Sequence, residues 1–202
     1  EAIAPLLFSE VLFFMSELQN LIKDCEKYID IRGIDETIIN AYLDTCQLAQ
    51  NDGDITTMLE CTARSKAIVN QFCLKQFGMD IWEIEKFAQA NKTEIELVNQ
   101  YYSTLLTESN EVFESFMLYL ERKRPIEERF YQPRINPLRQ VANGIQDLVD
   151  DKLDELFVNC PSRIGKTQIV KLGFLWYGSK FPEQSNLYTA YSDKITGGFY
   201  DG

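Results

Sequence analysis

The sequence predicts a mostly α-helical fold, in which an N-terminal helix array is followed by a single strand–helix–strand (βαβ) unit. From Phe8 to about Arg124 apolar residues recur with a period near 3.6, which is typical of helices packed on one face. Charge also divides the chain: residues 1–124 carry 21 acidic and 11 basic side chains, a net charge of -10, whereas residues 125–202 carry 10 and 9. We therefore expect an acidic helical domain over 1–124 and a linker helix plus the start of an α/β domain over 125–202.

The first three helices are expected from their stop and start signals. An apolar stripe that begins at Phe8 ends at Gly33, and Asp35 is the expected N-cap of the next helix, which continues to the break at 51–53. A third helix is expected to start after Asp54 and to stop at Gly78.

Shorter helices and the βαβ unit follow. The remaining elements are expected as helices over 81–90, 93–106 and 112–122, a helix over 138–149, a strand over 155–159, a helix from 169 to about 178 and a strand over 186–191. Pro125 separates the two segments, because proline cannot continue a helix.

Composition excludes several classes of function. The chain has no His, so neither Ser-His-Asp nor Cys-His catalysis is possible. A net charge of -11 disfavours a basic nucleic-acid-binding module. Five widely spaced Cys without a C-x-x-C pair favour reduced, buried thiols over disulfides. No apolar run approaches the ~20 residues of a spanning helix, so no membrane segment is expected.

The segment from Cys160 to Gln168 carries the chemistry. It follows an expected strand and precedes an expected helix, and it contains Gly165-Lys166-Thr167. In a phosphate-binding loop (P-loop) backbone N–H groups surround the phosphates, a Lys reaches the β/γ oxygens and a Ser/Thr hydroxyl binds Mg²⁺. Cys160 stands where the common motif has its first Gly, so the alternative is a polar loop in which Thr167 merely caps a helix.

The loop Pro161-Ser162-Arg163-Ile164-Gly165-Lys166-Thr167 resembles the variant Walker A motif of phage terminase large subunits, the ATPase motors that pump viral DNA into procapsids. Other parts of the chain also resemble that family: Arg129-Phe130-Tyr131-x-Pro133-Arg134, the stretches 138–148 and 152–156, Trp176-Tyr177 and Thr189-Ala190-Tyr191-Ser192-Asp193. The resemblance covers about residues 125–202.

The resemblance implies a role for each matching residue. Lys166 would contact the β/γ-phosphates, Thr167 would bind Mg²⁺, and Arg163 would face the γ-phosphate or an adjacent subunit. Arg163 and Lys166 are thus the implied catalytic residues. Ser162, Ile164 and Gly165 would contribute backbone groups to the phosphates. The turn from Phe130 to Arg134 matches the family's adenine-side motif, in which Tyr131, Gln132 and Arg134 would contact the nucleotide. The alternatives are that Phe130 and Tyr131 belong to the core and that Arg134 forms an ion pair with the acidic cluster at 147–151.

The resemblance also implies activity and partners. It implies an ATPase that uses ATP and Mg²⁺ to drive double-stranded DNA translocation, assembled as a homo-oligomer in the host cytoplasm with the small terminase subunit and the portal. A hydrolase of this class needs an Asp-Glu pair after a later strand, and none follows Thr167. We therefore expect these 202 residues to be the N-terminal part of a longer protein and to be inactive alone. The alternatives are a helical module that docks the small subunit or portal, and another P-loop NTPase such as a helicase or small-molecule kinase.

Overall fold

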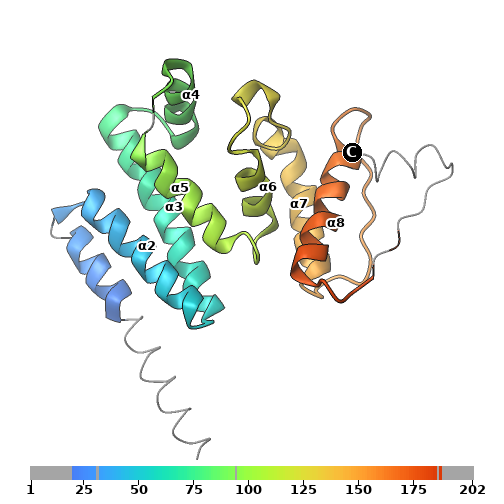
Figure 1. The fold of residues 1–202 in the computed structure, drawn as a ribbon, viewed down its shortest axis with the longest axis horizontal. Coiled ribbons are helices and arrows are strands. Elements are labelled where there is room, and N and C mark those ends of the chain that lie inside the picture. Colours follow the sequence, from blue (N-terminus) through green and yellow to red (C-terminus); the bar gives the residue numbers. More distant parts are fainter. Residues whose placement is uncertain (1–19, 31, 94, 186, 188–202) are drawn as a thin grey trace, which may run out of the picture. The chain divides into compact units, whose positions relative to one another are not determined.

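The computed structural model describes residues 20–30, 32–93, 95–185 and 187, and these residues are mostly helical (Figure 1). The chain divides into two compact units, residues 1–108 and 109–202. The expected mostly α fold is therefore confirmed. The start of the first helix, at 8–19, lies outside the described residues.

Unit 1 is a packed helix array. Its helices are a segment over 20–30, α2 (Glu36–Asn51), α3 (Ile55–Phe77), α4 (Ile81–Asn91) and α5 (Glu96–Glu108). Asp35 and Asp54 cap α2 and α3 by accepting from the backbone N–H of Ile38 and Thr57, as expected. Gly78 ends α3 in the left-handed conformation (φ 67°), which glycine adopts without steric cost.

The core of unit 1 is formed where α2, α3, α4 and α5 meet. Ile39, Tyr42 and Val69 are buried there with Leu97. All five cysteines of the protein are free thiols, as expected; four are buried in this unit, and burial raises the pKa of Cys73 to about 11. These four thiols therefore act as small apolar side chains.

Unit 2 contains the predicted loop. Its elements are α6 (Phe113–Glu121), the 3₁₀ turns η1 (Ile126–Glu128) and η2 (Gln132–Arg134), α7 (Ile135–Val149) and α8 (Lys166–Lys180). Phe113 of α6 and Trp176 of α8 are fully buried, with ring centroids 5.2 Å apart. Gly173 of α8 lies close to Ile145 of α7, so the two helices approach closely. Helix α6 thus packs with α7 and α8. The domain boundary that the sequence predicts after residue 124 stays a prediction.

The segment 155–159, expected as a strand, has no regular secondary structure. A strand requires a hydrogen-bonded neighbour, and no strand occurs in the described part of the chain. The second expected strand, 186–191, lies outside the described residues except for Leu187. The side chains of 156–158 nevertheless alternate: Leu156 and Val158 are half-buried, whereas Phe157 is 88% exposed.

Candidate functional site

The loop 160–165 connects the extended segment to the first residue of α8. Its backbone takes two positive φ angles, 66° at Arg163 and 107° at Gly165. An L-residue rarely adopts such angles, and glycine adopts them freely. Gly165 therefore fits its position for a conformational reason, and Arg163 marks a tight turn in the loop.

Lys166 reaches back across this loop. Its Nζ donates a hydrogen bond to the backbone oxygen of Cys160, at 2.6 Å, and its side chain is half-buried. The ammonium group thus closes the loop between its first residue and the first residue of α8. A cation held at this position lies where a phosphate surrounded by the loop would need one.

The N-terminus of α8 has no side-chain cap. Gly165 occupies the N-cap position, and the first turn contains no acidic residue. The first intrahelical bond runs from the N–H of Ile169 to the oxygen of Gly165, at 3.0 Å, so the preceding N–H groups have no helical acceptor. Helices α2, α3 and α4 instead each carry an aspartate cap, whereas α6 and α7 resemble α8 in having none.

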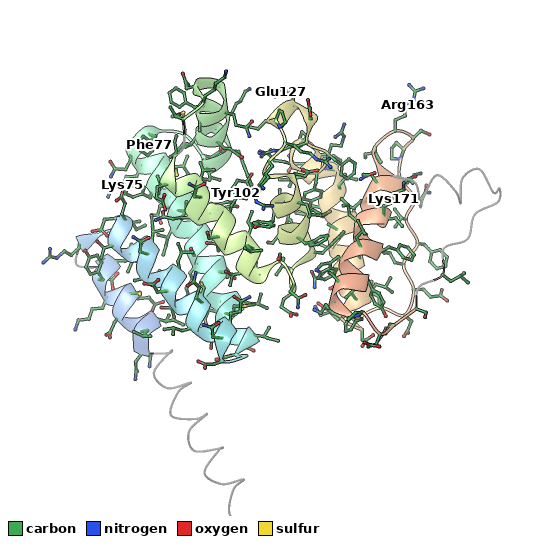
Figure 2. All side chains as sticks on the ribbon, in the orientation of Figure 1. Lys75, Phe77, Tyr102, Glu127, Arg163 and Lys171 are labelled. Carbon is green, nitrogen blue, oxygen red and sulfur yellow. The ribbon has the colours of Figure 1, made fainter. Side chains whose placement is uncertain are left out.

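The remaining predicted loop residues lie at the surface. Ser162, Arg163 and Thr167 are exposed and Ile164 is half-buried. Figure 2 shows Arg163 at the tip of the loop with its side chain directed away from the helices. Thr167 is the second residue of α8, in the first turn of the helix, where the N–H groups have no helical acceptor. These positions are compatible with a phosphate loop in which Thr167 would hold Mg²⁺ together with phosphate oxygens.

Tyr131 and Gln132 are engaged within the protein. The side chain of Tyr131 is fully buried, its hydroxyl donates to Glu114 at 3.0 Å, and burial raises the pKa of that hydroxyl. The side-chain oxygen of Gln132 accepts from the guanidinium of Arg129 at 2.9 Å. The predicted nucleotide contacts of Tyr131 and Gln132 stay predictions, but the described geometry gives both side chains a structural role.

Arg134 lies on the exposed side of the same turn. Its guanidinium donates to the backbone oxygen of Phe130 at 2.8 Å and sits 5.6 Å from the centroid of the Phe130 ring. Phe130 in turn contacts the loop, because a Cβ atom placed on Gly165 would lie 2.7 Å from its Cζ and closer still to Cε2. The turn 129–134 and the loop 160–165 are therefore neighbours in unit 2.

Sequence reasoning missed the residue that fixes this turn. Glu121, only 4% exposed, accepts backbone hydrogen bonds from Phe130, Tyr131 and Gln132 at 2.8–3.3 Å. Glu121 lies at the end of α6, on a helix of ordinary amphipathic pattern. Nothing in its local sequence distinguishes it from a solvent-exposed glutamate, so only the packing of α6 reveals it.

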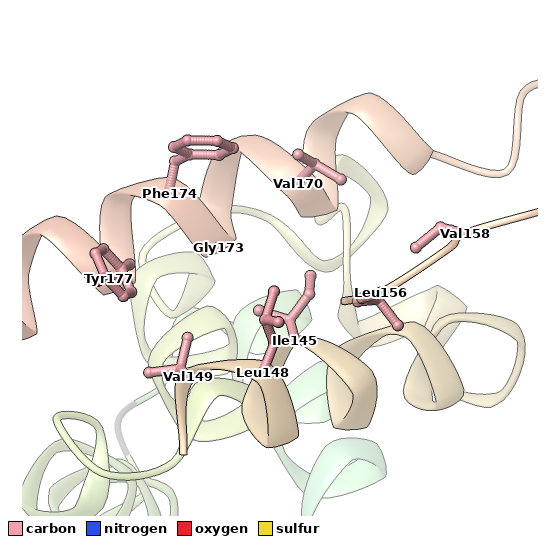
Figure 3. A pocket seen from close by; sticks show the side chains of 9 residues that line it. All are labelled: Ile145, Leu148, Val149, Leu156, Val158, Val170, Gly173, Phe174 and Tyr177. Atoms are coloured by element: carbon pink, nitrogen blue, oxygen red, sulfur yellow. The ribbon is translucent and has the colours of Figure 1, made fainter. Parts of the chain in front are cut away.

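An apolar pocket of about 290 Å³ lies between α7, α8 and the extended segment (Figure 3). Leu156 and Val158 line one side, and Ile145 and Phe174 line others. A Cβ atom on Gly144 of α7 would lie 2.8 Å from Leu156, so that side chain rests on bare helix backbone. None of the predicted nucleotide-binding residues lines this pocket, and we assign it no ligand.

Comparisons of the chain with family models, curated proteins and solved structures give no match, so the comparisons assign no family. No group of three or more Cys, Asp or Glu in the described residues is arranged to hold a metal ion by itself. No described helix combines the length and the apolar character that crossing a membrane requires.

Proposed function

We propose that residues 160–167 bind the phosphates of ATP with Mg²⁺, and that the chain is the N-terminal part of a viral DNA-packaging terminase large subunit. One observation carries the nucleotide site: Lys166 folds across the loop onto the oxygen of Cys160, at the uncapped N-terminus of α8. The terminase assignment rests on the resemblance of residues 125–202 to that family.

The electrostatics of α8 favour an anion at this position. A helix N-terminus carries a partial positive charge, so Lys166 in the first turn is unfavourable unless an anion lies nearby. The neutral Cys160 oxygen offsets that cost only partly. A phosphate oxygen offers the ammonium group a full negative charge, so the hydrogen bond to phosphate is also an ion pair, which the bond to a carbonyl oxygen is not. Phosphate binding would therefore move the Lys166 Nζ from the Cys160 oxygen to the ligand.

Each loop residue has a role in the proposal. Backbone N–H groups of Ser162 to Lys166 surround the phosphates, Lys166 contacts the β/γ oxygens and Thr167 holds Mg²⁺. Arg163, exposed at the tip of the loop, faces the γ-phosphate or a neighbouring subunit. Arg134, exposed in the turn next to the loop, would contact the nucleotide. Bound Mg²⁺ would neutralise phosphate charge, whereas the protein supplies position and hydrogen bonds.

The proposal includes the finer fold. In the whole ATPase core, segment 155–159 would form the first strand of a βαβ unit and α8 the helix that follows it; the second expected strand, 186–191, lies outside the described residues except for Leu187. The alternation at Leu156, Phe157 and Val158 supports the first strand, since successive side chains of a strand point to opposite faces.

Hydrolysis is proposed for the whole protein rather than for these 202 residues. Phosphoryl transfer to water needs a carboxylate to hold Mg²⁺ and a second group to orient the water, and no Asp-Glu pair follows Thr167. We therefore propose that the chain binds ATP without turning it over. Coupling to double-stranded DNA, assembly into a homo-oligomer and a location in the host cytoplasm follow from the resemblance alone.

A second candidate function concerns unit 1. It has its own core and an acidic composition, and Phe77 and Phe87 are each more than half exposed. These features suit a helical module that docks the small terminase subunit or the portal. Because unit 1 and the loop involve different residues, both functions are possible in one protein. Binding of a partner that survives Lys166→Ala would support this function separately.

Thermal melting with Mg-ATP tests the nucleotide proposal. A ligand present at 100 times its Kd stabilises the folded state by about 2.7 kcal/mol, so Mg-ATP raises the Tm of wild type. We expect no shift in Lys166→Ala and a wild-type shift in the control Lys171→Ala, which removes the same charge from the same helix. Equal shifts in wild type and Lys166→Ala would exclude Lys166 from the site. Loss of the shift in both variants would indicate non-specific charge binding.

A further inference from the structure

An aromatic ring, that of Phe130, contacts the loop glycine Gly165. The edge of Phe130 occupies the space where any side chain at Gly165 would begin. Phe130 is half-buried, and one edge of its ring packs against the backbone at Gly165. Gly165 thus has two reasons to be glycine: its φ of 107° and the ring beside it.

Both backbone polar groups of Phe130 are hydrogen-bonded, which fixes the position of its ring. The N–H of Phe130 donates to Glu121 at 2.8 Å, and its backbone oxygen accepts from Arg134 at 2.8 Å. The Arg134 guanidinium also lies over the ring, a cation–π arrangement at 5.6 Å. Glu121 is buried at the end of α6, so the ring is anchored to a helix outside the loop.

We infer that Phe130 is a positioning residue of the phosphate loop: its ring holds Gly165, and through Gly165 the backbone N–H groups that receive phosphate. This inference rests on the proposed function in that the loop binds phosphate. It differs from what the resemblance implies for this turn, which is contact with the base. Phe130 acts on the polyphosphate end of the nucleotide, through the loop backbone.

The physical reason is conformational freedom. Glycine has more accessible backbone conformations than any other residue, so a loop that turns at Gly165 samples many arrangements when free. A ring packed on that glycine removes the arrangements that would enter its volume. The loop then pays less ordering free energy on binding, which is how preorganisation raises affinity.

The contact itself can be tested without a ligand. An aromatic ring packed on Gly165 shifts the NMR signals of the Gly165 α-protons away from their usual positions through its ring current. We expect displaced Gly165 α-proton signals in the wild-type chain and a return toward ordinary values in Phe130→Leu, which keeps an apolar side chain. Phe181→Leu, at the far end of α8, is the control and leaves the Gly165 signals unchanged. Ordinary Gly165 shifts in wild type would overturn the inference.

The functional role is tested by two ligands, Mg-ATP and Mg-tripolyphosphate, which has no base. If Phe130 positions the loop, Phe130→Leu is expected to raise the Kd of both ligands by a similar factor of about ten. A tenfold change in Kd corresponds to ~1.4 kcal/mol, the cost of ordering the loop that the ring otherwise removes. Phe130→Tyr keeps a ring and restores both affinities toward wild type. A loss confined to Mg-ATP would show that the ring acts on the base and would overturn the inference.

The two proposals fail in different ways. If wild type binds neither ligand although the Gly165 signals are displaced, the proposed nucleotide function fails and the positioning role fails with it. If wild type binds both ligands and Phe130→Leu binds both equally well, the nucleotide function stands and the positioning role is wrong. Dispersed amide spectra of each variant establish that it folds.

Discussion

Replacing Glu121 by alanine tests how unit 2 holds the turn beside the loop. The carboxylate accepts hydrogen bonds from three consecutive backbone N–H groups, at Phe130, Tyr131 and Gln132. Alanine removes every acceptor while leaving the donors in place. Buried donors without a partner cost more than the net value of the hydrogen bonds they lose, because water does not replace the acceptor.

The magnitude follows from the burial of each donor residue. Tyr131 is fully buried, so its N–H bears the whole penalty of roughly 1–3 kcal/mol for an unsatisfied buried group. Phe130 and Gln132 are half-buried, and water partly satisfies their N–H groups. We therefore expect Glu121→Ala to lower the free energy of unfolding of unit 2 by about 2–4 kcal/mol, from one unsatisfied buried N–H group and two that water satisfies in part. Glu121→Gln keeps one acceptor oxygen and is expected to cost roughly half as much.

Urea unfolding followed by tryptophan fluorescence measures this effect. The chain has two tryptophans, and Trp176 is buried in unit 2 whereas Trp82 belongs to unit 1. In a Trp82→Phe background the signal reports unit 2 alone. The matched control is Glu127→Gln, which removes the same charge at an exposed position close in sequence and is expected to change stability by less than about 0.5 kcal/mol. If Glu121→Ala unfolded at the same urea concentration as Glu127→Gln, the assigned role of Glu121 would be refuted.

Gly165→Ala places a Cβ atom against the Phe130 ring at a backbone φ of 107°, which L-residues rarely adopt. In calorimetry this variant is expected to bind Mg-ATP at least tenfold more weakly. The control Gly178→Ala, where the added Cβ meets open space, is expected to leave binding unchanged. Cys160 is half-buried whereas the other four cysteines are buried, so Cys160 is expected to react first with iodoacetamide. Bound Mg-ATP is expected to slow this reaction. Equal rates with and without nucleotide would contradict a ligand in the loop. The hydrogen bond from Tyr28 lowers the pKa of the Asp35 carboxyl below its ordinary value of 3.8. The stabilisation of unit 1 by ionised Asp35 is therefore present above pH 3.8 and is lost as the pH falls through the lowered pKa. Asp35→Asn keeps a good N-cap without this titration, and in urea unfolding it is expected to lose less stability than wild type between about pH 5 and 2.

Local signals made most of the helix array predictable. Asp35 and Asp54 stand directly before apolar-periodic stretches, and Gly78 directly after one, so α2 and α3 begin and end where the sequence indicates. Such caps depend on residues within one helical turn, which a sequence shows. Helix α8 begins at Lys166 and ends at Lys180, whereas its apolar residues predicted a helix from 169 to about 178.

Contacts between distant segments could not be read from the sequence. Tyr131 belongs to a motif expected at the nucleotide, yet its ring is fully buried and its hydroxyl bonds to Glu114, because α6 packs over the turn. The packing of Phe130 on Gly165 joins residues 35 positions apart, and no spacing rule predicts it. The expected strand over 155–159 cannot be established from its own residues, because a strand forms only when it pairs with another segment of the chain.

Backbone amide NMR shifts on addition of Mg-ATP test whether residues 160–167 bind the nucleotide. If residues 160–167 surround the phosphates, the largest changes occur at the N–H groups of Ser162 to Lys166 and at Thr167, and Lys166→Ala abolishes them at the same nucleotide concentration. Unchanged loop amides at millimolar Mg-ATP, or changes that persist in Lys166→Ala, would contradict the account.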